Sequence, residues 1–178
     1  MGVWITVAPG DYAGDVKADF HCSGVHDEHV LQAAIDRAVA DNKNVFLLNG
    51  VYHMDGFRNV YGDGGPLTTL CLPNTWREIR IIGENSEYGF QKDYRNGVVL
   101  YVPEEALESA PGEKDVLRGQ WTNAGIQNGS SLCLENISVV LADNAHPIRC
   151  IDLRRTDRAE VRNMTLLGYG DAIAPDSP

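Results

Sequence analysis

The sequence predicts an all-β solenoid, in which short strands stack coil upon coil as in a parallel β-helix. The first observation is an internal echo. Residues 134–140 (LENISVV) and 161–167 (VRNMTLL) share an Asn before an apolar run and begin 27 positions apart. A repeat of this length is typical of one structural coil stacked on another. The second observation is that most apolar runs are short and end at Gly, Pro or Asn, as strands joined by turns do.

Composition limits the class of protein. The chain has 178 residues, which indicates a single domain over 1–178, and 43% of them are apolar, enough for a hydrophobic core. A net charge of −10 argues against a nucleic-acid partner, because phosphates require Lys and Arg clusters. No apolar run of 18 residues predicts a membrane span, and the first residues do not resemble a signal peptide. Cellular location stays open.

The N-terminal region is expected to hold a strand at 3–7, a loop at 11–25 and the one convincing helix at 28–40. Asp27 is the expected N-cap, accepting hydrogen bonds from the free backbone N–H groups. Apolar residues at helical spacing give this helix one buried face. The capping-helix segment is placed at 27–41, and its apolar positions are Val30, Leu31, Ala34, Ile35, Ala38 and Val39.

Every element after the helix is expected to be a short strand. The predicted strands are 45–48, 51–54, 67–72, 79–82, 98–102, 131–134, 137–141, 148–153 and 164–167. An irregular insertion is expected over 83–130, containing the 98–102 strand and one helical turn within 103–110. Residues 76–78 are expected to occupy the coil position of 134–136. The echo places Ile137 over Met164 in the core and Asn136 over Asn163 at a turn, where Asn tolerates left-handed backbone.

The four cysteines do not form a CxxC pair, so a zinc or redox motif is not indicated. Cys71, Cys133 and Cys150 each lie inside an apolar run. They are expected to be free buried thiols that pack as small hydrophobes. Disulfides are the alternative if the protein is exported.

Three segments resemble the N-terminal motif of the pectate-lyase-like superfamily: residues 17–36 (KADFHCSGVHDEHVLQAAID), 44–52 (NVFLLNGVY) and 79–83 (IRIIG). Ser23 and Glu28 depart from that motif, which usually has Asp at both places. The resemblance implies a right-handed parallel β-helix with one N-terminal capping α-helix. Members of the superfamily are usually much longer. The chain is therefore expected to be incomplete at its C-terminal end, or to cover that end by forming a homo-oligomer, in particular a trimer.

The resemblance implies a carbohydrate-active protein, a polysaccharide hydrolase or lyase or the N-terminal part of one. The alternatives are a non-enzymatic glycan-binding or phage tailspike-like β-helix and a purely structural scaffold. The expected partner is a polysaccharide or glycan, with neither nucleic acid nor membrane. No cofactor is expected, apart from Ca²⁺ if the protein is a lyase.

Carbohydrate cleavage uses paired carboxylates, and the candidates chosen as catalytic are Asp152 and Asp171. Asp152 alternates with Cys150 and Arg154 along a predicted strand, so it shares their face, and if that face is outward, Asp152 and Arg154 lie on the solvent side of a coil. Asp152 and Asp171 could instead be solvated surface charges, and aromatic side chains of the 83–130 stretch could be loop anchors. Ion pairs between coils are the competing interpretation for an arginine cluster: Arg149, Arg154, Arg155, Arg158 and Arg162. The expected substrate-binding residues are Arg154, Arg155, His146, Tyr94 and Trp121.

Histidines cluster around the expected helix start. His21, His26 and His29 do not follow a recognised metal-ligand spacing, so they are predicted to be exposed residues near the cap, and a metal site is not expected.

Overall fold

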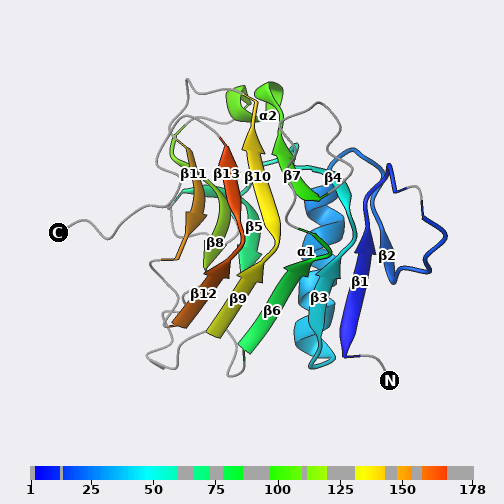
Figure 1. Cartoon of the computed structure of the whole chain (residues 1–178). Coiled ribbons are helices and arrows are strands. Elements are labelled where there is room, and N and C mark those ends of the chain that lie inside the picture. Colours follow the sequence, from blue (N-terminus) through cyan, green and yellow to red (C-terminus); the bar gives the residue numbers. More distant parts are fainter. Residues whose placement is uncertain are drawn as a thin grey trace.

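A computed structural model of the chain describes residues 3–12, 14–59, 66–72, 78–85, 97–109, 112–119, 131–142, 148–153 and 158–167. It is mostly β, and its strands form three sheets in which all strand pairs are parallel (Figure 1). In this part of the chain, neither helix has the length and apolar character needed to cross a bilayer.

The N-terminal region contributes two strands and the long helix. These are β1 (Trp4–Ala8), β2 (Phe20–His21) and α1 (Asp27–Ala40). The chain then makes repeated passes through the three sheets. The first pass is β3 (Asn44–Leu47), β4 (Gly50–His53) and β5 (Leu67–Leu72). The second is β6 (Glu78–Gly83), β7 (Val98–Val102), the short helix α2 (Glu104–Glu108) and β8 (Lys114–Gly119).

The remaining passes follow the same order. The third pass is β9 (Ser131–Glu135), β10 (Ile137–Leu141) and β11 (Ile148–Asp152). The fourth adds β12 (Arg158–Arg162) and β13 (Thr165–Leu167). Each of the first three passes thus adds one strand to each sheet in turn, and the fourth adds β12 to the first sheet and β13 to the second. The first sheet has the order β12-β9-β6-β3-β1-β2, the second β13-β10-β7-β4 and the third β11-β8-β5.

The 27-residue echo corresponds to neighbouring strands in register. Leu134 pairs with Val161 in the first sheet, and Ser138 pairs with Thr165 in the second. The two asparagines between these strands have left-handed backbone, with φ of 58° at Asn136 and 47° at Asn163. The Asn163 side-chain Nδ2 donates to Asn136 Oδ1 over 3.3 Å, so the expected polar ladder is confirmed.

One expected alignment is wrong. The prediction aligns residues 76–78 with residues 134–136. In the structure, Ile79 pairs with Leu132 and Ile82 pairs with Glu135. The equivalent of Asn136 is therefore Gly83, whose carbonyl accepts a hydrogen bond from Asn136 Nδ2 over 3.2 Å. A Cβ at Gly83 would overlap with the Asn136 carbonyl oxygen, so this close approach requires glycine.

Three strands are absent from the prediction, and the shortest of them, β2, lies within the expected 11–25 loop. β8 falls in the middle of the expected 83–130 insertion, and β12 falls between two predicted strands. Both are rich in charged residues, which hides the period-two pattern of a half-buried strand. All residues of β8 are nevertheless buried, because it is the central strand of the third sheet.

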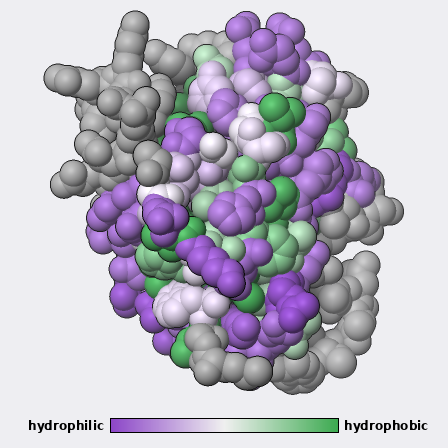
Figure 2. Space-filling model, turned by 90° about the vertical axis from the view of Figure 1, so that its right-hand side faces the viewer, coloured by the Kyte–Doolittle hydropathy of each residue, from purple (hydrophilic) through white to green (hydrophobic). Residues whose placement is uncertain are grey.

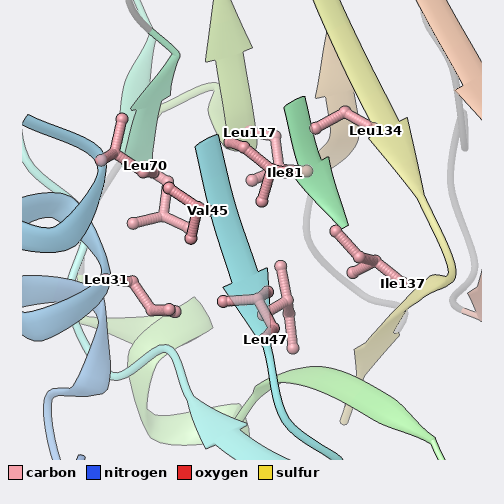
Figure 3. Close-up of a pocket in the computed structure, with 10 residues that line it drawn as sticks. Leu31, Val45, Leu47, Leu70, Ile81, Leu117, Leu134 and Ile137 are labelled. Carbon is pink, nitrogen blue, oxygen red and sulfur yellow. The ribbon is translucent and has the colours of Figure 1, made fainter. Parts of the chain in front are cut away.

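The apolar core lies between the sheets and is closed at one end by α1. The helix contacts β1, β3, β4 and β5, which include the first-pass strand of every sheet. Figure 2 looks onto this end of the molecule, where hydrophilic and hydrophobic residues intermingle on the surface. Figure 3 shows the interior, where Leu31 of α1 and side chains such as Val45, Ile81 and Leu134 surround a small void with a wholly apolar lining. Such a void stays dry and offers nothing to a sugar.

The start of α1 differs from the prediction. The N-cap is His26, in left-handed backbone (φ 51°), and Asp27 is the first helical residue. Asp27 does accept backbone hydrogen bonds, but from the preceding loop and from β4 instead of from the helix. Its Oδ1 lies 3.0 Å from the nitrogens of Ser23 and Gly24, and its Oδ2 lies 3.0 Å from that of His53. The fully buried Asp27 carboxylate therefore ties the helix start to the first pass.

Candidate functional site: a charged cluster on the third sheet

Of the seven residues predicted to form a site, the structure describes one. Asp152 is the last residue of β11, on the edge strand of the third sheet. The other six lie outside the described residues: Asp171, Arg154, Arg155, His146, Tyr94 and Trp121. The site is therefore built from Asp152 and its neighbours.

Asp152 belongs to a charged cluster that we define as Lys114, Asp115 and Arg118 of β8 together with Arg149 and Asp152 of β11. The register places Arg149 beside Asp115 and Asp152 beside Arg118. Asp115 is fully buried, and Arg118 and Asp152 are 1% and 2% exposed. Charged residues are rarely buried to this extent unless they are paired.

Arginines hold the Asp115 carboxylate from two sides. Arg149 Nε donates to Asp115 Oδ1 over 2.6 Å, and its Nη1 donates to Glu113 Oε2 over 3.1 Å. Arg118 Nε lies 3.7 Å from Asp115 Oδ2, while its Nη1 donates to the Pro66 carbonyl over 3.0 Å. Within the described residues, Asp115 Oδ2 accepts no hydrogen bond.

Opposing influences act on the pKa of Asp115, and its net direction is upward. Burial raises the pKa of Asp115, and the nearby charge of Asp152 raises it further, against the opposing effect of Arg149 and Arg118. Burial also lowers the pKa of Lys114, whose Nζ lies 6.0 Å from the centre of the Phe57 ring. The arrangement therefore combines a buried carboxyl group of raised pKa with a second carboxyl group and two arginines.

The sequence predictions for this region have mixed outcomes. The competing interpretation of a solvated surface charge is wrong for Asp152, because the face that it shares with Cys150 is buried. Ion pairing between coils is confirmed for Arg149, which reaches from the third pass to Asp115 on the second. The sequence prediction does not include Asp115 and Arg118, because it places them in a loop. The only signal in the sequence is the apolar pair Val116 and Leu117 between those charges.

The cysteines do not supply a nucleophile. All four are free and buried, as expected for the three that lie in apolar runs. Burial raises the pKa of the Cys150 thiol to about 11, and burial together with the Asp27 carboxylate raises that of Cys22 further. The thiolate is the reactive form, so the raised pKa makes Cys22 and Cys150 poor nucleophiles at neutral pH.

One group of described residues has the composition of a metal site. His26, Glu28 and His29 bring their ligand atoms within 4.8 Å of one another at the start of α1. His26 and His29 are exposed, as predicted, and so is His21, which is not part of this group.

Comparison with known proteins adds no relative: no protein-family model, no curated protein and no solved structure matches the chain.

Proposed function

We propose that the chain is a right-handed parallel β-helix that acts on a polysaccharide as a hydrolase or lyase. The fold part of this proposal is supported by the order in which the chain visits the three parallel sheets, adding one strand to each on three successive passes. A solenoid of stacked coils has this connectivity. In a parallel sheet, the connection from one strand to the next is almost always right-handed, so a right-handed coil is the favoured form.

The chemistry is supported chiefly by one arrangement, two buried carboxyl groups, Asp115 and Asp152, on the neighbouring strands β8 and β11, where burial raises the pKa of Asp115. Glycoside hydrolysis uses one carboxyl group with a raised pKa to protonate the leaving oxygen, and a second, ionised carboxylate as base or nucleophile. Asp115 fits the acid role, with its proton on Oδ2. Asp152 fits the second role. Arg149 and Arg118 match the carboxylates of an acidic sugar.

The test is a reducing-sugar and unsaturated-product assay on a panel of neutral and acidic polysaccharides. We expect the wild type to be active. In both Asp115→Asn and Asp152→Asn, we expect the activity to fall by about 10²-fold or more. Asp36→Asn, an exposed carboxylate on α1, serves as the control and should retain activity. Full turnover by the two cluster variants would remove them from the mechanism. Circular dichroism of each variant separates loss of chemistry from loss of fold.

The second candidate is a non-enzymatic β-helix, either glycan-binding or tailspike-like. It is favoured by the burial of both Asp115 and Asp152, which also suits a structural ion-pair network. In that case the edge strands β12 and β13 would pair with copies of the chain. Light scattering at several concentrations tests this alternative. A trimer without activity on the panel supports it, and an active monomer contradicts it.

A further inference from the structure

We propose that His26, Glu28 and His29 form a binding site for a divalent transition-metal cation, with Zn²⁺ as the natural probe. This proposal is independent of the proposed function, because the site lies at the start of α1 and not on the third sheet. Two imidazoles and a carboxylate without sulfur are a ligand set that suits Zn²⁺, Co²⁺ or Ni²⁺.

The distances within the group fit a single ion. Glu28 Oε1 lies 3.1 Å from His26 Nδ1 and 3.7 Å from His29 Nε2. Ligands at about 2.0–2.1 Å from a tetrahedral zinc ion lie about 3.3–3.4 Å from each other. An ion between these atoms would therefore need only small side-chain movements.

The surroundings hold Glu28 in place for this role. Its side chain is 1% exposed, although a carboxylate is rarely buried without a partner. The backbone N–H of Asp55 donates to Oε2 over 3.1 Å, which turns Oε1 toward the two histidines. Asp55 Oδ2 in turn accepts from the His26 backbone nitrogen over 2.6 Å. Outer contacts of this kind orient metal ligands.

A glycine keeps space open at the same oxygen. A Cβ at Gly56 would lie 2.7 Å from Glu28 Oε1 and 3.8 Å from His26 Nδ1, so any side chain there would crowd the site. The two histidine side chains are 57% and 60% exposed, which gives an ion a path from solvent. With three protein ligands, the remaining coordination position would be taken by water.

The positive charge of Arg58 should weaken cation binding at this site, so replacing Arg58 provides a specific test. Its Nη1 lies 3.5 Å from His29 Nδ1, and its positive charge would repel a cation at His29 Nε2. Arg58→Met is therefore expected to tighten zinc binding several-fold. An unchanged or weaker affinity in this variant would contradict the placement of the ion beside His29.

The decisive experiment is a calorimetric titration of the full chain with Zn²⁺. One ion per chain is expected, with an affinity about tenfold or more weaker in His26→Asn and in His29→Gln. Asn is chosen at position 26 because it tolerates the left-handed backbone there. His21→Ala removes an exposed histidine outside the group and should bind as the wild type does.

Two results would overturn the proposal: no zinc binding by the wild type, or equal affinity in the wild type and the two histidine variants. Because the chain has four cysteines, Co²⁺ provides a further check. Its absorption spectrum should lack a thiolate charge-transfer band, and the presence of that band would assign the metal to cysteine instead. The melting temperature of each variant is measured without metal. A value equal to that of the wild type establishes that the variant is folded.

Discussion

The two ends of the stacked strands differ in how their side chains are covered. At the N-terminal end, α1 packs across β1, β3, β4 and β5, and Leu31 is only 2% exposed. At the other end, β12 and β13 are the outermost described strands of their sheets (Figure 1). Val161 of β12 is 36% exposed, whereas its register partner Leu134 on β9 is fully buried.

This difference shows that the repeat alone does not determine burial. Leu134 and Val161 pair in register on neighbouring strands, but among the described strands Leu134 has a neighbour on both sides and Val161 on one side. Burial in a solenoid is supplied by the neighbouring repeat or by a cap. Substitutions should therefore be most costly in the middle passes, costly at the capped end, and mild in β12.

The largest effect is expected in the middle of the stack, from Gly83→Ala. The added Cβ would overlap with the backbone carbonyl of Asn136, which cannot rotate away as a side chain could. We expect a loss of about 3 kcal/mol or more in the free energy of unfolding, measured by urea denaturation. Gly112→Ala is the control, because its φ of 93° is strained but its Cβ meets open space, so the cost should be nearer about 1 kcal/mol. Equal costs would contradict the close packing of the second and third passes.

The matched pair Leu134→Ala and Val161→Ala compares the covered and the outermost coil directly. Removing the fully buried Leu134 side chain should cost about 2–5 kcal/mol, because it leaves a cavity. Removing the partly exposed Val161 side chain should cost less than about 1 kcal/mol. Thermal and urea unfolding measure both. A Val161 variant as unstable as the Leu134 variant would mean that β12 is covered as well.

Asp27→Asn examines the capped end. The carboxylate accepts backbone hydrogen bonds at both oxygens, and an amide offers only one oxygen. We expect a cost of about 1–3 kcal/mol, since a buried backbone donor loses its acceptor. Asp36→Asn on the exposed face of the same helix should leave stability nearly unchanged. If both substitutions are neutral, the buried carboxylate does not hold the helix start to β4.

The smallest expected effect concerns pH and Asp115. Its pKa is raised in the folded state, so the folded protein binds more protons at this site than the unfolded chain does. The stability that Asp115 contributes is therefore full below its unfolded pKa and is lost as the pH rises through its folded pKa. The unfolding free energy of the wild type minus that of Asp115→Asn should therefore fall as the pH is raised from about 4 to 7. A difference that grows over this range would contradict the raised pKa.

The sequence anticipates the features that depend on local pattern. The α1 helix follows from apolar spacing, and the left-handed Asn136 and Asn163 follow from the echo. The features it misses depend on partners that are distant in sequence. Asp115 is buried because Arg149 crosses from the next pass to meet it, and nothing near Asp115 in the chain indicates this. For the same reason the Glu28 carboxylate, oriented by Asp55, is not recognisable from the spacing of the histidines.

The central claim is that successive passes lie side by side as parallel strands in a 27-residue register at the C-terminal end. Nuclear Overhauser effects between backbone protons test it most directly. We expect backbone contacts of the parallel-strand type between residues 131–135 and 158–162, and between residues 138–140 and 165–167. Contacts of the antiparallel type, or contacts shifted from this register, would contradict it.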